Sequence, residues 1–404
     1  MAWANILLQR VSPALKALSL VASSLESSAL SESEQADIRV EADIVRAVIA
    51  VSSDRIAGVP DLIAECLARP ETLRAWVVSA GSNLASAVAI AQFDFVEARR
   101  LQEWATGYHQ RTIGPFSKMY GYCFAGIAAM EQLDITAAED NFRLAVQTAT
   151  KSIGSHSHAA RLAGALLGEL MYELGRLDEA ERLLDESYEL GPEAGIVDFM
   201  IARFVTGARL KAARGDVVSA ARHLDEGASA AASLGLPRLR ARVENERVRL
   251  GLPASPQPPP TAGKPTREPD FGFAEIIAQL DDATEIRKQS AVEPDVACRR
   301  AQEWVRRVEQ ERRPRAAMQA NRLLVACLVA AGRVDEAKPV LASIAATCVR
   351  IGFVRYLIDG GPRMVPALTA LLEDRRAGRW PPDRPDVPAE FLAAALETAT
   401  PIES

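Results

Sequence analysis

The sequence predicts an all-α protein, built as a curved stack of antiparallel helix pairs. Hydrophobic residues make up 49% of the 404-residue chain but aromatic residues only 5%, so Ala, Leu and Val supply most of the apolar surface. Ala and Leu both favour helices. In addition, a short element that joins two helices by a tight turn recurs along the chain, and its clearest copies have a glycine at the turn.

The recurring element consists of a helix end, a tight turn and a helix start that carries a small residue. Its clearest copies have Gly175, Gly215 or Gly332 at the turn and an alanine five residues later. The small residues of all copies stand at positions 14, 58, 98, 138, 180, 220 and 337, and the first six are 40 to 44 residues apart. Such a period holds two helices of about 15–20 residues, and pairs of this kind bury their apolar faces by stacking into a solenoid.

Each part of this element has a physical role. Glycine readily adopts the left-handed conformation that ends many helices, so Gly175, Gly215 and Gly332 are predicted to follow a helix directly. An Asp or Ser near the turn can accept hydrogen bonds from the first N–H groups of the next helix. The small residue, one turn later, lets the neighbouring helix come close.

Composition divides the chain into four segments. Residues 1–252 form the repeat array, and residues 253–272, rich in proline and polar residues, are expected to be an extended linker. Residues 273–375 are expected to form a second block of helical repeats, and residues 376–404 a proline-rich tail with one short helix at about 389–398. Because no polar capping helix precedes residues 3–25, we also expect a neighbouring domain at that edge.

One unit matches the tetratricopeptide (TPR) pattern, with Gly168 in the first helix, Ala180 twelve residues later, and then Pro192. Gly126 and Ala138 repeat the glycine-to-alanine step. The chain therefore resembles a TPR-like superhelix of antiparallel helix pairs. Its period is longer than the usual ~34 residues, so its helices are expected to be longer than those of a standard repeat.

Residues 352–364, GFVRYLIDGGPRM, are similar to a G-x-x-R-x-F-L-D-E-G signature near the end of the sensor region of MalT-type transcriptional regulators. Tyr356 stands in place of the first aromatic residue and Gly361 in place of the acid. This resemblance covers most of the chain and implies a sensor that binds a small inducer. No helix-turn-helix domain is found after Arg375, and the composition is rich in Ala and Arg. The chain therefore also resembles the MalT-like region of mycobacterial-type serine/threonine kinases.

Several functions are excluded by composition and motifs. The weak net charge of −6 is unlike that of nucleic-acid-binding proteins, so we expect no direct contact with nucleic acid. Gly263 and Lys264 lie in the proline-rich segment and do not form a phosphate-binding loop, and no nucleophile-elbow, zinc-protease or kinase motif is present. No window reaches the ~18 apolar residues of a membrane span. We expect a chain that is not itself an enzyme and has no cofactor and no membrane contact.

The cysteines and histidines also lack the spacing of a metal site. The five cysteines are odd in number and contain no CxxC pair, so we expect them to be buried and reduced, as in the cytoplasm. His156 and His158 are two residues apart and would not share a helix face, so no metal is expected there.

In TPR arrays the first helix of each pair lines the concave surface, where a ligand or an extended peptide can bind. Counting back from the small residues places seven polar or aromatic residues near this surface: Asp43, Asn83, Tyr120, Glu169, Tyr172, Arg209 and Arg322. The alternative for each is an ordinary helix-surface position. Basic runs at 238–249 and 306–315 contain glutamates and are interpreted as solvated helix faces with ion pairs.

The repeat and the resemblance together predict a non-catalytic sensor or regulatory module of a multidomain signalling protein, either a transcriptional regulator or a serine/threonine kinase. Its expected partners are a small effector or a partner protein, and the other domains of the parent chain. The first alternative is a free-standing scaffold that docks proteins through the groove. The second is a helical enzyme, which would need a deep pocket with perturbed titratable groups.

Overall fold

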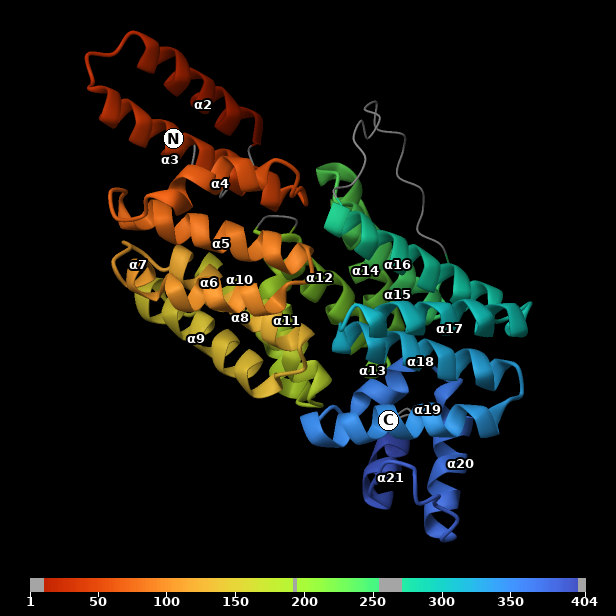
Figure 1. Ribbon diagram of the computed structural model, residues 1–404. Helices are drawn as coiled ribbons and strands as arrows, with labels where there is room; N and C mark the ends of the chain where they lie inside the picture. Colours follow the sequence, from red (N-terminus) through yellow and green to blue (C-terminus); the bar gives the residue numbers. More distant parts are fainter. Residues whose placement is uncertain (1–10, 192–194, 254–270, 399–404) are drawn as a thin grey trace.

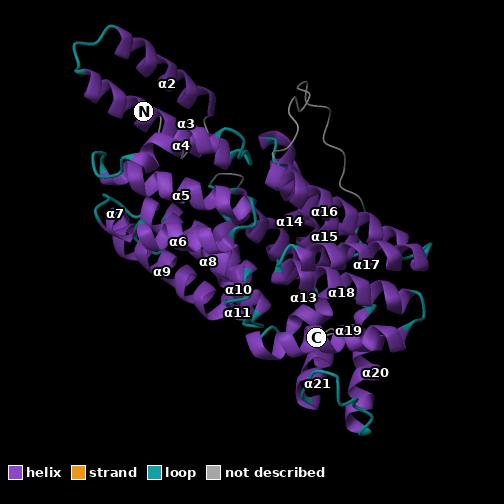
Figure 2. Ribbon diagram, in the orientation of Figure 1, coloured by secondary structure: helices purple, strands orange, loops and turns teal. Residues whose placement is uncertain are grey.

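The computed structural model describes residues 11–191, 195–253 and 271–398, and every regular element in these ranges is a helix (Figure 2). This confirms the prediction of an all-α protein. Consecutive helices stack side by side into a curved array (Figure 1). Most of the expected linker at 253–272 lies outside the described residues.

The helices follow one another in pairs joined by short turns. Their bounds are α2 Val11–Glu26, α3 Glu32–Ser52, α4 Val59–Ala68, α5 Ala75–Ala91, α6 Phe95–Trp104, α7 Thr106–Gln110, α8 Phe116–Glu131, α9 Ile135–Ile153, α10 His158–Glu173, α11 Leu177–Tyr188, α12 Val197–Ile201, α13 Gly207–Ala213, α14 Val217–Leu234, α15 Pro237–Arg249, α16 Phe271–Gln289, α17 Pro294–Gln310, α18 Pro314–Ala330, α19 Val334–Ile351, α20 Met364–Arg376 and α21 Ala389–Glu397. A π-helical turn, η1 Ala202–Thr206, joins α12 to α13, and a 3₁₀ helix, η2 Arg355–Gly360, precedes α20.

The short turns within the pairs share one conformation, in which the second residue after the end of the first helix has positive φ. Gly175, Gly215 and Gly332 adopt it, with φ of 74°, 83° and 73°, as the sequence predicted. In two earlier pairs Phe93 and Leu133 adopt it instead, with φ of 64° and 60°. The same turn is therefore built with and without glycine, and the copies without glycine carry backbone strain.

In the pairs joined by these turns, the second helix is capped in one of two ways. Asp94, Asp134 and Asp216 each accept a hydrogen bond from a backbone N–H three residues later, at 2.9, 3.3 and 2.8 Å, as predicted. In the turns that follow Gly175 and Gly332, the cap position is an arginine, Arg176 or Arg333, without a side-chain cap bond. There the acids lie in the first turn of the helix, where their negative charge interacts favourably with the positive end of the helix dipole.

Arg312, between α17 and α18, also has positive φ, at 55°, and its side chain is exposed. Replacing Arg312 by Gly is expected to raise the free energy of unfolding by about 1 kcal/mol, because glycine relieves the left-handed strain at a smaller entropic cost. Urea titration would measure this. As a matched control, Gly332→Ala introduces the same strain at a site where a Cβ meets no atom within 4 Å, and it should destabilise the protein. A loss of stability in Arg312→Gly would contradict the argument.

Six of the seven small residues of the repeat are completely buried, as predicted. These are Ala14, Ala98, Ala138, Ala180, Ala220 and Ala337, each 0% exposed. The prediction is wrong for Gly58, which is exposed and precedes the first turn of α4 with φ of 75°. Its helix pair is joined by a longer connection, so the period of the repeat does not place a buried residue there.

The glycines of the TPR-like units allow close contact between paired helices. A Cβ on Gly168 of α10 would lie 2.9 Å from Cγ of Leu184 in α11. A Cβ on Gly126 of α8 would lie 2.4 Å from the ring of Phe142 in α9. Both distances are too short for any side chain, so these positions need glycine for packing rather than for backbone conformation.

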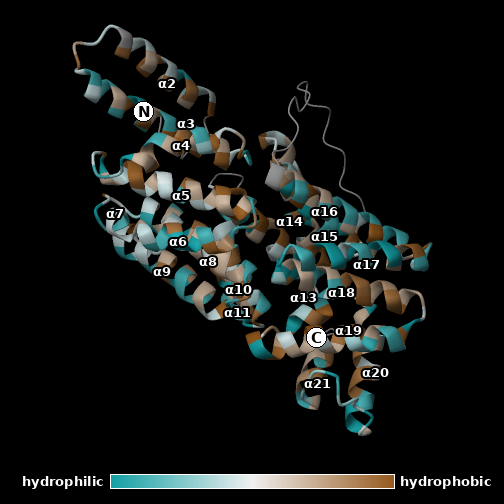
Figure 3. Ribbon diagram, in the orientation of Figure 1, coloured by the Kyte–Doolittle hydropathy of each residue, from teal (hydrophilic) through white to brown (hydrophobic). Residues whose placement is uncertain are grey.

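The curvature of the array creates an interior space. One hydrophobic core extends from Val40 in α3 to Ala395 in α21 and includes both expected repeat blocks. Across the concave side, α18 contacts α8, and η2 contacts α10. Hydrophobic and hydrophilic residues alternate along the ribbons (Figure 3), as expected for amphipathic helices. The later helices therefore contact the earlier ones across the concave face.

All five cysteines are buried and free, as predicted. Burial raises the pKa of the Cys66 thiol to about 11 and that of Cys327 to about 12, so both stay protonated and poorly nucleophilic near neutral pH.

Among the described helices, none is both long and apolar enough to cross a membrane.

His109 of α7 is a buried histidine, 7% exposed, held by Ser79 of α5 and Gln102 of α6. Its Nδ1 lies 2.6 Å from Oγ of Ser79 and its Nε2 lies 3.0 Å from Oε1 of Gln102. Burial, with the charge of Lys118 as a second cause, lowers the pKa of His109 to about 4. The folded protein therefore keeps this imidazole neutral under conditions in which the unfolded chain would protonate it.

The stability of the protein is expected to fall as the pH decreases from about 6.5 to 4, because the unfolded chain then binds a proton that folded His109 does not. By pH 5 this contribution amounts to about 2 kcal/mol. His109→Gln should lose this part of the pH dependence, as measured by urea titration at pH 7.5 and pH 5. The exposed His156 provides the control, and His156→Gln should keep the wild-type slope. An unchanged slope in His109→Gln would refute the prediction.

Candidate functional site

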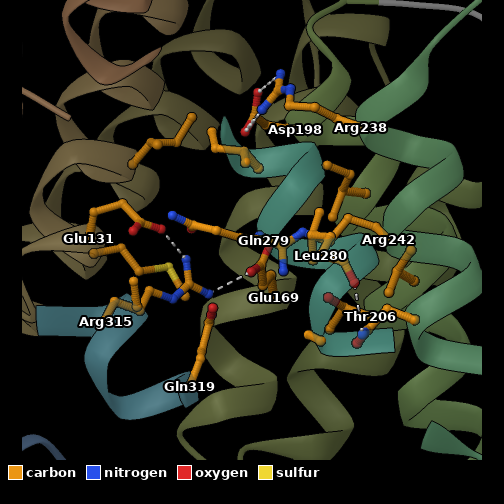
Figure 4. A pocket seen from close by; sticks show the side chains of 18 of the residues that line it. Glu131, Glu169, Asp198, Thr206, Arg238, Arg242, Gln279, Leu280, Arg315 and Gln319 are labelled. Atoms are coloured by element: carbon orange, nitrogen blue, oxygen red, sulfur yellow. Dashed lines mark hydrogen bonds and ion pairs between the residues drawn. The ribbon is translucent and has the colours of Figure 1, made fainter. Parts of the chain in front are cut away.

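A cavity of about 180 Å³ lies on the concave side of the array. Its walls come mainly from α8, α10, α13, α15, α16 and α18. Figure 4 shows side chains from several of these helices converging on the same space. The π-helical turn η1 adds Val205 and Thr206 to the wall, and turns of this kind often occur at functional positions. The cavity is therefore formed by helices that are far apart in the sequence and face one another across the concave side of the array.

Arg315 joins two sides of this cavity. Its guanidinium group donates hydrogen bonds to Oε1 of Glu131 in α8, at 3.0 Å, and to Oε1 of Glu169 in α10, at 2.9 Å (Figure 4). Although burial opposes it, the two carboxylates raise the pKa of Arg315, so its guanidinium group stays charged. We call these three residues the α18 clasp, because they connect α18 to two helices of the first repeat block.

Glu246 of α15 holds two more arginines of the wall. Its carboxylate accepts hydrogen bonds from Arg209, with Nε at 3.1 Å and Nη2 at 2.9 Å, and from Nε of Arg249 at 2.9 Å. Glu246 is 2% exposed. Although burial raises it, the charges of Arg209 and Arg249 hold the pKa of Glu246 well below its usual range. Arg249 also donates to the carbonyl oxygen of Asp359 at 3.1 Å, which links segment 352–364 to the wall.

Arg238 marks one end of the cavity (Figure 4). It donates from Nε to Oδ1 of Asp54 at 2.5 Å, and from both Nη atoms to Asp198 at 3.2 and 3.3 Å. The second carboxylate oxygen of Asp54 accepts the backbone N–H of Arg238 at 3.2 Å, in the first turn of α15. Although burial lowers it, Asp198 and Asp54 raise the pKa of Arg238. The turn before α4 is thereby fixed to α15.

Three arginines of the wall have no carboxylate partner in the part of the chain that the structure describes: Arg242, Arg287 and Arg322. Arg322 donates from Nη1 to the carbonyl oxygen of Tyr356 at 2.7 Å, and its guanidinium carbon lies 4.0 Å from the centre of that ring. Burial is the main cause that lowers the pKa of Arg242. Burial, with the charge of Arg322 second, lowers the pKa of Arg287 to about 9.

A buried acid completes the charge distribution. Glu173 of α10 is 4% exposed, its Oε1 lies 3.6 Å from Nη1 of Arg209, and its Oε2 has no hydrogen-bond partner among the described residues. Burial raises the pKa of Glu173. The wall therefore has unsatisfied groups of both signs, with the unpaired cations more numerous.

Of the seven predicted groove residues, Glu169, Arg209 and Arg322 line the cavity. Tyr172 lies behind the wall with 0% exposure, and its hydroxyl donates a hydrogen bond to Oδ1 of Asp359 at 3.0 Å. Asp359 belongs to segment 352–364, so the segment that carries the MalT-like resemblance packs against the inner helices of the array.

The other three predicted residues lie elsewhere. Asn83 of α5 is 7% exposed and donates to a backbone carbonyl of α8 at 2.8 Å. The ring of Tyr120 packs against that of Phe199, with 5.6 Å between centroids. Asp43 pairs with Arg46 of the same helix at 2.6 Å. The structure does not bring these three to the cavity, because each lies in the first helices or on a face turned toward the core.

The interpretation of the basic runs as solvated faces is wrong for the residues that line the cavity. In the first run these are Arg238, Arg242 and Arg249, and in the second Arg313 and Arg315. The three residues of the first run are separated by four and seven positions, so they share one face of α15. This spacing was the available signal. The physical reason for the error is that α15 and α18 are enclosed by the curve instead of facing solvent.

This arrangement suits recognition of charge more than proton transfer. Guanidinium groups bind oxyanions through charge and paired hydrogen bonds, and most wall carboxylates are already engaged by arginines. The described residues contain no group of three or more His, Cys, Asp and Glu placed to hold a metal ion.

No family model matches the chain. Over 365 residues, 89% of its length, it is 47% identical to the serine/threonine-protein kinase PknK of Mycobacterium tuberculosis, in the strains CDC 1551 and H37Rv. PknK of Mycobacterium bovis matches with the same identity and coverage. The chain spans 33% of the length of these relatives. The resemblance to part of a mycobacterial serine/threonine kinase, expected from the sequence, is thus confirmed.

Proposed function

We propose that this chain is a non-catalytic regulatory module of a serine/threonine kinase, acts in the cytoplasm, and binds a small effector in the arginine-lined cavity. The match to one third of each kinase relative supports a module that works with other domains. It favours a kinase over a transcriptional regulator as the parent protein. Five free, buried thiols fit a reducing compartment.

The observation that carries the effector hypothesis is the cavity lined by arginines without an ion pair. An extended peptide would need an open groove, but here α18 and η2 contact α8 and α10 across the concave side. A space of about 180 Å³ suits a small molecule better than a docked protein segment. This favours the sensor over the free-standing scaffold.

The α18 clasp connects ligand binding in the cavity to the position of α18, and so to other domains of the parent protein. Arg315 connects α18 to Glu131 and Glu169, so the charge balance of the cavity and the position of α18 are linked. A ligand that changes this balance would shift the packing of the later helices against the earlier ones, and a domain attached to either block would sense the change.

The modular part of the proposal is tested by the native protein in its own cells. We would determine its mass by immunoblot and map its peptides by mass spectrometry. A species much heavier than 43.6 kDa, with kinase-domain peptides, is the expected result. A native species of 43.6 kDa would contradict the proposal and favour a free-standing protein.

The effector part is tested by melting the 404-residue chain against a library of neutral and charged metabolites. At least one compound should raise the melting temperature and slow amide hydrogen exchange in α10, α13, α15 and α18, whose residues form the cavity. If no compound does either, the cavity is not an effector site. Protection confined to other helices would argue for a different site.

A further inference from the structure

The wall of the cavity has arginines that its own carboxylates leave unpaired. Eight arginines line it, and five of them form ion pairs with Asp or Glu. The remaining three are Arg242, Arg287 and Arg322, for which the described residues supply no ion pair. They come from three different helices, α15, α16 and α18, which face one space.

Unpaired cations in such a place are costly to the folded protein. Arg322 is 7% exposed, and the Nε atoms of Arg242, Arg287 and Arg322 have no hydrogen-bond partner among the described residues. A buried charge without a partner destabilises a protein, and an apolar side chain of similar size would pack there at lower cost. Arg242 and Arg287 are half-buried. Three arginines without an ion pair around one cavity indicate that the missing negative charge comes from outside the chain.

We infer that the cavity binds a small oxyanion with at least two negative charges, a phosphate compound or a polycarboxylate, through Arg242, Arg287 and Arg322. This inference rests on the proposed function, because it names the chemical class of the effector. Guanidinium groups suit such a ligand, since their planar N–H pairs match the oxygens of phosphates and carboxylates. The surrounding ion pairs keep the other arginines in place. The three without an ion pair can therefore bind the ligand, Arg322 through atoms other than the Nη1 that donates to Tyr356.

The size and polarity of the cavity limit the ligand further. Its volume of about 180 Å³ is below the ~300–1,000 Å³ of pockets for drug-sized ligands. Asn245, Gln279 and Gln319 also line it, and Figure 4 labels Gln279 and Gln319 among the side chains at the cavity. These amides can bind hydroxyl or ester oxygens of the same molecule. A compact phosphate or carboxylic acid fits better than a nucleotide.

The experiment uses the 404-residue chain with inorganic phosphate, pyrophosphate and citrate as probes. Titration calorimetry and thermal melting should show binding and a raised melting temperature for at least one of them, and the preferred probe separates the phosphate class from the polycarboxylates. Arg242→Gln and Arg287→Gln should each weaken that binding by at least about tenfold. Arg240→Gln, an exposed residue of the same helix as Arg242, should stay within about twofold.

A second measurement separates a binding role from a structural one. In the absence of ligand, Arg287→Met should raise the melting temperature, because it removes a half-buried charge that has no ion pair and keeps the apolar contacts. If Arg287 only supported the fold, the same variant would melt at a lower temperature, and the inference would be overturned.

Failure of the inference can be distinguished from failure of the proposed function. If none of the three anions binds, or if binding is equally strong in Arg242→Gln, Arg287→Gln and Arg240→Gln, the inference is wrong. A neutral compound that protects the cavity helices while the anions do not would also overturn it, yet would leave the effector hypothesis intact. If no compound of either kind protects these helices, both fail.

Discussion

Replacing Glu246 by Gln is expected to lower the free energy of unfolding by about 3–5 kcal/mol. The carboxylate of Glu246 is 2% exposed and is the anion that both Arg209 and Arg249 contact. The amide has the same shape but no charge, so two buried guanidinium groups would lose their main compensation. Removing one partner of a buried ion pair costs more than the pair itself contributes, because the other charge remains buried. Urea titration at pH 7 measures the loss.

A matched control lies on the same helix. Glu244 is half-exposed, 3.6 Å from Nζ of Lys288, and Glu244→Gln should cost less than about 1 kcal/mol. Because the pKa of Glu246 is depressed in the folded protein, its contribution is present above about pH 5 and is lost as the pH falls below the unfolded value of about 4.3. Glu246→Gln should lack this part of the acid sensitivity. Equal losses in both variants would contradict the assigned role.

Much of the fold could be predicted from local sequence signals. The alanines at 98, 138, 180 and 220 are buried at the predicted period, and the turn glycines have the predicted conformation. These signals depend on a few neighbouring residues, so they can be read from the chain itself. How strongly the array curves depends instead on small rotations between successive pairs, summed over many helices. No single motif contains that information, so contacts such as those of α18 with α8 could not be predicted.

The candidate site was predictable to a smaller degree than the fold. Glu169, Arg209 and Arg322 were found because they lie on first helices, which do line the concave side. Arg242 and Arg287 were missed, because the identity of an arginine does not reveal whether the helix that carries it is enclosed. For Arg242, the spacing of four residues from Arg238 indicated that the two side chains share one face of a helix. For Arg287 only the three-dimensional meeting of α16 with α18 places it at the cavity.

The second large effect is expected at Asp54. Asp54→Asn should lower the free energy of unfolding by about 3 kcal/mol, because Arg238 is buried and Asp54 is its best-buried partner, 4% exposed. The amide of Asn keeps one acceptor oxygen but would place its NH2 group against either the Nε or the backbone N–H of Arg238, both of which now donate to the carboxylate. Asp54 has φ of 59°, a conformation that Asn also tolerates, so the substitution changes the charge with little effect on the backbone.

The control for this prediction is the second acid that binds Arg238. The side chain of Asp198 is 27% exposed and accepts from Arg238 at 3.2 and 3.3 Å, so Asp198→Asn should cost only about 1 kcal/mol. Urea titration gives both losses, and amide hydrogen exchange locates them. Because Asp54 joins the turn before α4 to the first turn of α15, its loss should speed exchange in α3, α4 and the start of α15 together. If exchange accelerates only in α3 and α4, the contact does not couple the early helices to the cavity wall, and Arg238 is held by Asp198 alone.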